Sequence, residues 1–177
     1  MSPSPTTLLS EFGIQQRGKA IGVIYADAPV VLMQGNALDA LVAYSMEDLQ
    51  REQGAFLLGV RHTKPSAPHG AVEVRHFVRA TETRNSSGAI AFTPDTWAAF
   101  HQTAREQYPQ ETLLGWHHTH PGINVFLSPY DLFIHRHFFR EPWHIALVVD
   151  PCRREFGFFQ WRKNEIVDCG FICVESA

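Results

Sequence analysis

Two histidines, a serine and an aspartate fall within one short stretch of this sequence at spacings that suit a metal centre. His118, His120, Ser128 and Asp131 form the pattern His-x-His-x7-Ser-x-x-Asp. Neutral imidazole nitrogens and a carboxylate oxygen are ligands that zinc prefers in proteins. Three such ligands leave the fourth tetrahedral position for water, which is typical of catalytic zinc sites rather than of closed structural ones.

The residues before the histidines are typical of a strand. Thr112 to His118 is largely apolar, and side chains two residues apart on a strand project from the same face. His118 and His120 are therefore expected to form a chelating pair, while His117 points to the opposite face. Taken alone, however, His-x-His also occurs in strands as packing or surface histidines.

The serine and the aspartate are expected at the start of a helix. Ser128 precedes a proline, which is favoured at the first helical position, so Ser128 is predicted to be the N-cap of a helix that runs to Phe139. Asp131 then lies in the first turn. Ser-x-x-Asp before an apolar run is also an ordinary capping signature. It is the combination with the two histidines that favours a metal site.

The stretch Gly-Trp-His-His-Thr-His-Pro-Gly-Ile-Asn-Val-Phe-Leu-Ser-Pro-Tyr-Asp resembles the signature of the JAMM (also called MPN+) zinc isopeptidases. That family also has a glutamate at the start of a strand that ends in glycine seven residues on, and Glu52 and Gly59 fit this spacing. Ala55 is a small departure, since many members carry glycine there. The resemblance covers roughly residues 30–174.

The resemblance implies an α/β fold in a single JAMM/MPN domain, with a cytidine-deaminase-like mixed β-sheet flanked by helices. It also implies one zinc ion with its bound water, held by His118, His120 and Asp131. Glu52 would move the proton as general acid and base, and the Ser128 hydroxyl would stabilise the tetrahedral intermediate. Capping and catalysis by Ser128 are compatible, because they use different atoms.

Substrate and partners follow from the resemblance as well. It implies cleavage of the bond after the C-terminal glycine of a ubiquitin-like protein, whose carboxyl tail would order the polar insertion from Thr81 to Ile90. The sequence of residues 131–136 and 142–150 resembles prokaryotic members of this family more than eukaryotic ones. These frequently accompany activating and conjugating enzymes, including those of antiphage conjugation systems.

Two other functions remain open, and a third is excluded. A peptidase that trims a sulfur-carrier protein or a small peptide would share every catalytic residue, and a non-catalytic scaffold would share the fold. A nucleobase deaminase would need His-x-Glu and Pro-Cys-x-x-Cys around its zinc, and neither occurs.

Composition is consistent with one domain. The chain has 177 residues, of which 45% are hydrophobic, and we expect a flexible tail over residues 1–19 followed by the domain over 20–177. A net charge of −3 without a Lys/Arg cluster argues against a nucleic-acid partner. No apolar run is long enough for a membrane helix, and the amino terminus lacks a signal-peptide pattern, so a cytoplasmic location is expected.

Periodicity predicts the remaining elements. One helix is expected from Asn36 as N-cap to about Gln50, and another after Thr93 as N-cap. The predicted strands cover residues 20–25, 30–33, 55–60, 72–78, 143–149, 156–161 and 166–174, with a loop over 64–70.

Further histidines and the cysteines carry weaker signals. His135 and His137 are two apart on a predicted helix, where they diverge by about 200° and cannot chelate one ion. His135 lies four residues after Asp131 and therefore on the same face of the predicted helix. It is either a hydrogen-bond partner that orients Asp131 or simply a neighbour on that face. The three cysteines, which include no Cys-x-x-Cys, are expected to be reduced thiols rather than a second zinc site.

Overall fold

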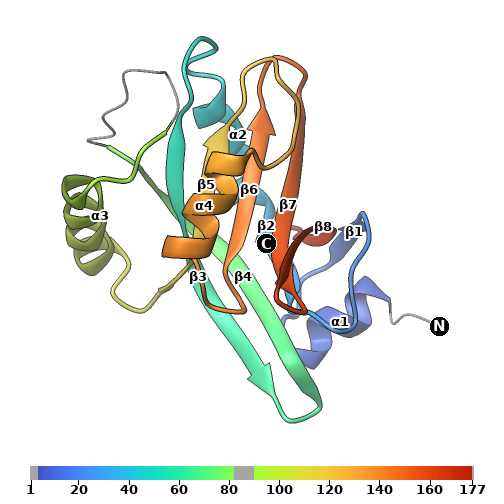
Figure 1. Ribbon diagram of the computed structural model, residues 1–177. Coiled ribbons are helices and arrows are strands. Elements are labelled where there is room, and N and C mark those ends of the chain that lie inside the picture. Colours follow the sequence, from blue (N-terminus) through green and yellow to red (C-terminus); the bar gives the residue numbers. More distant parts are fainter. Residues whose placement is uncertain (1–3, 82–89, 177) are drawn as a thin grey trace.

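The computed structural model describes residues 4–81 and 90–176. Within them a nine-stranded mixed sheet has the order β1-β9-β2-β4-β3-β5-β6-β7-β8, with both parallel and antiparallel neighbours (Figure 1). The strands are β1 Gly18–Ile21, β2 Val30–Gln34, β3 Gly54–Lys64, β4 Ala67–Arg79, β5 Thr112–Thr119, β6 Ile145–Asp150, β7 Glu155–Arg162, β8 Glu165–Cys169 and β9 Phe171–Val174. The helices are α1 Pro5–Glu11, α2 Gly35–Ser45, α3 Pro94–Gln107 and α4 Pro129–Phe138. The predicted mixed sheet flanked by helices is confirmed.

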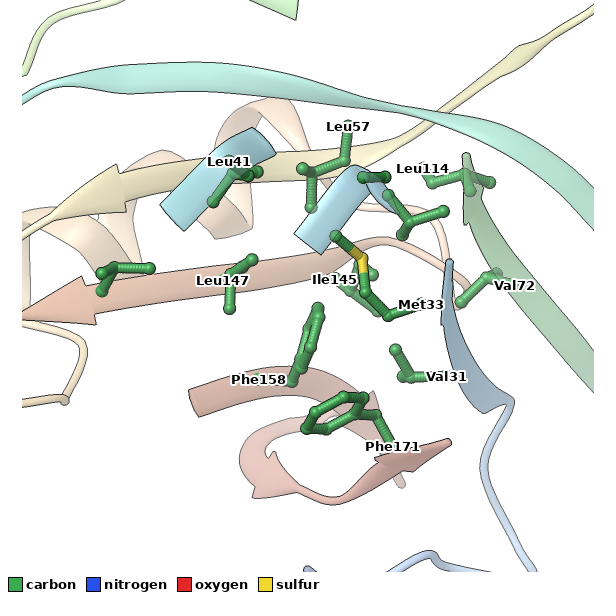
Figure 2. Packing of buried hydrophobic residues seen from close by; sticks show 13 residues of the cluster. Val31, Met33, Leu41, Leu57, Val72, Leu114, Ile145, Leu147, Phe158 and Phe171 are labelled. Carbon is green, nitrogen blue, oxygen red and sulfur yellow. The ribbon is translucent and has the colours of Figure 1, made fainter. Parts of the chain in front are cut away.

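Two apolar clusters lie on opposite faces of this sheet. Helix α2 places Leu41 in the first cluster, where it packs with Leu57, Leu114 and Leu147 between α2 and the sheet (Figure 2). Helices α3 and α4 cover the other face through the second cluster, which includes Phe100, Trp116, Ile134 and Phe139. None of the described helices has the length and the apolar character needed to span a bilayer.

The sheet curls, so that strands far apart in its order make side-chain contact. Phe158 of β7 and Phe171 of β9 have ring centroids 5.0 Å apart, although β9 lies near one end of the strand order and β7 near the other (Figure 2). The chain passes between these ends at Gly170, where an added Cβ would lie 2.5 Å from the Ile21 carbonyl oxygen. The strand predicted over residues 166–174 is therefore wrong as a single element, because Gly170 divides it into β8 and β9.

The predicted flexible tail over residues 1–19 is wrong for the described residues 4–19. Helix α1 is capped by the Ser4 side chain, and its Leu9 is completely buried. Leu9 and Phe12 pack in a third cluster against Val30 and Ile172. Ser4 followed by Pro5 is a helix-start signal of the same kind as Ser128 followed by Pro129, whereas the partners that bury Leu9 and Phe12 lie far away in the sequence.

Other element boundaries also differ from prediction. The N-cap of α2 is Gln34 rather than Asn36, and β1 covers Gly18–Ile21 rather than residues 20–25. Helix α2 ends at Ser45 rather than near Gln50, and the Asp48 carboxylate accepts the N–H groups of Gln50 and Arg51 in the turn that follows. The loop predicted over residues 64–70 is largely strand, because β3 and β4 continue into a long hairpin. The second predicted helix is confirmed, with Thr93 as its N-cap.

A buried carboxylate joins three strands near the middle of the sheet. Glu73 of β4 accepts hydrogen bonds from Gln34 of β2 at 2.6 Å, from His62 of β3 at 2.8 Å and from Arg75 at 2.9 Å. Burial alone would raise the pKa of Glu73, but these three donors outweigh it and lower the pKa to about 2. The carboxylate is therefore a charged cross-link between strands.

We expect Glu73→Ala to lower the free energy of unfolding by about 3 kcal/mol. This value is the lower end of the range for breaking a buried ion pair, because Arg75 keeps access to water. Since the folded-state pKa lies below the ordinary value of 4.5, the contribution is complete above that value and is lost as the pH falls toward about 2. Urea unfolding of both proteins at several pH values tests this. An equal loss for the exposed Glu165→Ala would contradict it.

Candidate metal centre

The candidate ligands lie at the carboxyl end of β5, which is paired on both sides. His118 is opposite Gly54 of the antiparallel β3 and opposite Val148 of the parallel β6. An extra residue at Leu114 shifts the pairing with β3, so strict alternation holds only beyond this bulge. From there on, Trp116 and His118 face α4, while His117 faces α2, as alternation predicts.

Three ligand atoms converge beside this strand end. His118 Nε2 and His120 Nε2 are 3.1 Å apart, and each lies 3.3 Å from Asp131 Oδ2. All three residues are buried. A tetrahedral zinc ion with ligands at about 2.0–2.1 Å separates them by about 3.3–3.4 Å, so the cluster has the dimensions of one face of such a site. His118, His120 and Asp131 could therefore hold a metal ion, as the sequence predicts.

The tautomer of His120 also suits metal binding. Its Nδ1–H donates to the carbonyl oxygen of Asn124 at 3.1 Å, which leaves the Nε2 lone pair facing His118 and Asp131. Two imidazole lone pairs and a carboxylate oxygen at this separation would repel one another without a cation or proton between them. The donor set therefore fits a zinc ion.

Stacked rings fix the orientation of His118. The indole of Trp116 lies parallel to its imidazole, with centroids 4.4 Å apart and an interplanar angle of 11°. The Trp116 indole N–H donates to His135 Nδ1 at 3.0 Å. His135 thus contacts the site through Trp116 and is not hydrogen bonded to Asp131. Burial, followed by repulsion from His144, lowers the pKa of His135 to about 3, so it accepts this bond as a neutral ring.

The aspartate and the serine hold each other in a capping box at the start of α4. The Ser128 N–H donates to Asp131 Oδ2 at 2.7 Å, and the Asp131 N–H donates to Ser128 Oγ at 3.1 Å. Ser128 is thus the predicted N-cap and also aims the Asp131 carboxylate at the histidines. Burial raises the pKa of Asp131, but hydrogen bonds and positive charge from His118 and His120 in their protonated form, together with the hydrogen bond from Ser128, outweigh it and hold the pKa well below its usual range.

Glu52 lies just before β3 and reaches the same cluster. Its backbone is placed by the neighbouring Gln53. The Gln53 N–H donates to the Thr119 hydroxyl oxygen at 2.8 Å, and the Thr119 N–H donates to the Gln53 carbonyl oxygen at 2.9 Å. Glu52 Oε1 is 4.0 Å from His120 Nε2, and Oε2 accepts the Ile90 N–H at 2.8 Å. Gly54 makes room for Ile90, because an added Cβ would lie 1.9 Å from Ile90 Cδ1.

A buried aspartate that the sequence analysis did not single out organises the loop after His120. Asp150, at the end of β6, accepts the N–H groups of Gly122, Asn124, Cys152 and Arg153 at 2.9–3.2 Å. Asn124 has φ 79°, which presents its carbonyl oxygen to His120. The four N–H groups outweigh the effect of burial and lower the pKa of Asp150.

The remaining sequence-based candidates lie elsewhere. His117 bonds Ser45 of α2 and the Leu147 carbonyl oxygen, and burial and then repulsion from His118 lower its pKa to about 3. His137 bonds the Phe133 carbonyl oxygen on the exposed side of α4. Apart from its ends, the insertion from Thr81 to Ile90 lies outside the described residues. The described part of the chain holds no second group of metal ligands, and its three cysteines are free thiols.

Comparison with known proteins places these residues in a family. Residues 35–163 match the family described as prokaryotic homologs of the JAB domain. A stretch of 78 residues is 33% identical to the COP9 signalosome complex subunit 5 of Caenorhabditis elegans, over 43% of this chain and 20% of that protein. Another of 83 residues is 30% identical to the NAD(+) hydrolase TcpA of Theionarchaea archaeon (strain DG-70-1), over 46% of this chain and 25% of that protein.

A solved structure supports the fold. Protein DSY2949 from Desulfitobacterium hafniense superposes with a TM-score of 0.62 at 17% identity, over 83% of this chain and 94% of that one. At this identity the likeness concerns the fold alone. The chain spans only 20% and 25% of the lengths of the two curated relatives.

We expect Asp150→Asn to weaken zinc binding about 10- to 100-fold, because the amide cannot accept all four N–H groups that place the Asn124 carbonyl against His120. Competition with a chromogenic chelator measures the affinity, and circular dichroism checks that the variant is folded. Asp168→Asn, an exposed change of the same charge, serves as control. Equal affinities for Asp150→Asn and wild type would show that the loop does not position His120.

Proposed function

Because the chain belongs to the prokaryotic homologs of the JAB domain, we propose that it is a zinc-dependent isopeptidase or peptidase of the JAMM type. The observation that carries the proposal is the cluster of His118, His120 and Asp131 atoms at 3.1–3.3 Å, with a Glu52 oxygen 4.0 Å from His120 Nε2. Three ligands with an acid-base residue at their edge suit the hydrolysis of an amide bond.

Zinc held by His118, His120 and Asp131 would supply a Lewis acid that polarises the scissile carbonyl and lowers the pKa of the attacking water. The chain's own residues then handle protons and charge. Glu52 Oε1 lies at the edge of the cluster, where it can accept the proton of the attacking water and deliver it to the leaving amine. The bond from the Ile90 N–H to Oε2 keeps the carboxylate in this orientation.

Ser128 is suited to stabilise the developing oxyanion. Its Oγ lone pair is used by the Asp131 N–H, while the hydroxyl proton remains able to donate to a substrate oxygen beside the ligands. The N-cap position fixes the side chain at the start of α4, so the donor needs little reorganisation when charge develops. Capping and catalysis thus use different atoms of one residue.

We propose the extended carboxyl tail of a ubiquitin-like protein as the substrate, cleaved after its C-terminal glycine during deconjugation or precursor processing. The exposed side chains of Ile123 and Phe126 lie in the loop after His120, and the Phe126 ring is 4.8 Å from the His120 ring. An apolar surface beside the ligands supports binding of a peptide. The two ends of the polar insertion start beside β3, because the Ile90 N–H bonds Glu52 and the Ala80 N–H bonds the Gly54 carbonyl oxygen.

The finer setting of the reaction is also a proposal. We place the chain in a bacterial ubiquitin-like conjugation system with an antiphage role, together with its activating and conjugating enzymes. The resemblance of residues 131–136 and 142–150 to prokaryotic members supports this setting. Trimming of a sulfur-carrier protein or a small peptide is the alternative, and it would use the same Glu52 and ligands. A non-catalytic scaffold is disfavoured by the complete ligand set.

We expect Glu52→Gln to lower the rate of cleavage about 10²- to 10⁴-fold, because the amide cannot take up the proton of the attacking water. The assay uses ubiquitin-like proteins fused through their carboxyl tail to a reporter, and zinc content is measured in parallel. Zinc should stay bound, since Glu52 is not a ligand. Wild-type rates in Glu52→Gln would refute the mechanism, and bound zinc without cleavage of any fusion would refute the isopeptidase.

Two substitutions of Ser128 separate capping from catalysis. Ser128→Ala removes both the cap and the hydroxyl, so we expect it to cost about 1 kcal/mol of stability and about 10²- to 10³-fold in kcat. Ser128→Asn restores a good cap without the hydroxyl, and should recover the stability but not kcat. Thermal unfolding and steady-state kinetics measure the two quantities. Recovery of kcat by Ser128→Asn would assign the residue a purely structural role.

A further inference from the structure

A second cleft lies at the opposite end of α4 from the metal centre. It has a volume of about 740 Å³ and is bordered by the carboxyl end of α4, the loop before β2, strand β3 and the turn between β7 and β8. Its polar lining is strongly basic, with five arginine and lysine side chains and one acid, Asp27. The cationic residues are Arg61, Arg136, Arg140, Arg162 and Lys163.

The single acid is already matched by two of these cations. Arg162 binds both carboxylate oxygens of Asp27, at 2.7 and 3.2 Å, and Lys163 Nζ is 3.2 Å from Oδ2. These bonds lower the pKa of Asp27 to about 2, so the group stays ionised. Asp27 is therefore paired with Arg162 and Lys163, and it makes no ion pair with the other three cations of the lining.

The other three cations have no acidic partner among the described residues. Arg136 and Arg140 are exposed near the carboxyl end of α4 and make no ion pair there. Arg61 lies over the ring of Trp143, with its guanidinium carbon 3.4 Å from the ring centroid. The flat guanidinium is thereby held in place with its N–H donors directed outward around its rim. Three arginines thus face one cleft with unused donors.

We propose that this cleft binds a small molecule that carries a polyphosphate group. Guanidinium groups form paired hydrogen bonds with phosphate oxygens, and a multiply charged anion is needed to balance several arginines. The volume falls within the range of small-molecule sites and exceeds that of a single phosphate. The indole rings of Trp143 and Trp161 in its lining offer apolar surface for the rest of the ligand.

The shape favours a small molecule over an acidic protein segment. A protein segment would need a long basic surface, whereas here the cations surround one hollow and the chain as a whole has a net charge of −3. Two ligand sources remain within the proposal: an inorganic polyphosphate, or a nucleotide whose base also contacts an indole ring. Comparing the two as probes distinguishes these sources.

The test is a titration of the zinc-loaded protein with ATP and with inorganic tripolyphosphate at physiological salt, followed by calorimetry and tryptophan fluorescence. We expect saturable binding of one equivalent, which the double variant Arg136→Gln/Arg140→Gln weakens about tenfold or more through the loss of two charged donors. Tighter binding of ATP would assign the base a contact, and equal binding would assign recognition to the phosphates alone.

The matched control is the double variant Arg17→Gln/Arg105→Gln, which removes the same charge from exposed positions outside the cleft. It should bind both probes like wild type. Absence of saturable binding, equal weakening in both double variants, or unchanged binding in Arg136→Gln/Arg140→Gln would overturn the proposal, as would binding of a poly-glutamate peptide alone. Because no turnover is measured, the result is independent of the proposed isopeptidase activity.

Discussion

The end of β5 is the constraint on which the rest of the site depends. His118 pairs with Gly54 on one side and with Val148 on the other, and the sheet continues past the strand through hydrogen bonds from Thr119 to Gln53 and from His120 to Val149. A shift of this strand by one residue would exchange the faces of its side chains. His117 would then enter the site, and His118 would be turned toward α2. The position of the candidate ligands is therefore a property of the sheet register.

Burying so many polar groups near one strand end requires a partner for nearly every one. Asp150 satisfies four backbone N–H groups, Ser128 and Asp131 satisfy each other, and His120 uses the Asn124 carbonyl. His118 Nδ1 is an exception, since it is buried without a hydrogen-bond partner among the described residues. Such a group costs about 1–3 kcal/mol. A cation bound at Nε2 would leave Nδ1 without a partner, so this atom remains a cost in the stability of the folded chain.

The parts of the site that sequence could predict are those governed by local geometry. Alternation along a strand separates His117 from His118, and the capping box needs only the spacing between Ser128 and Asp131. Asp150 reaches the N–H groups of Gly122 and Asn124 across 28 and 26 residues of sequence, and the Trp116 N–H reaches His135 across 19, so the sequence alone could not assign these contacts. The same reason explains the fold: β5 could be predicted from composition, whereas the bulge at Leu114 depends on its pairing with β3.

Contacts across the α4 face also connect the metal centre to the basic cleft. Trp161, which lines the cleft, has its ring centroid 5.4 Å from that of His135; His135 accepts the Trp116 N–H, and Trp116 stacks on His118. The Trp161 indole N–H is held by the Phe139 carbonyl oxygen, so hydrogen bonds fix both indoles. Coupling between two sites requires an element with two arrangements that the ligands distinguish. Because these bonds favour one arrangement of the rings, an occupant of the cleft would stabilise the folded state by mass action and leave the position of His118 unchanged.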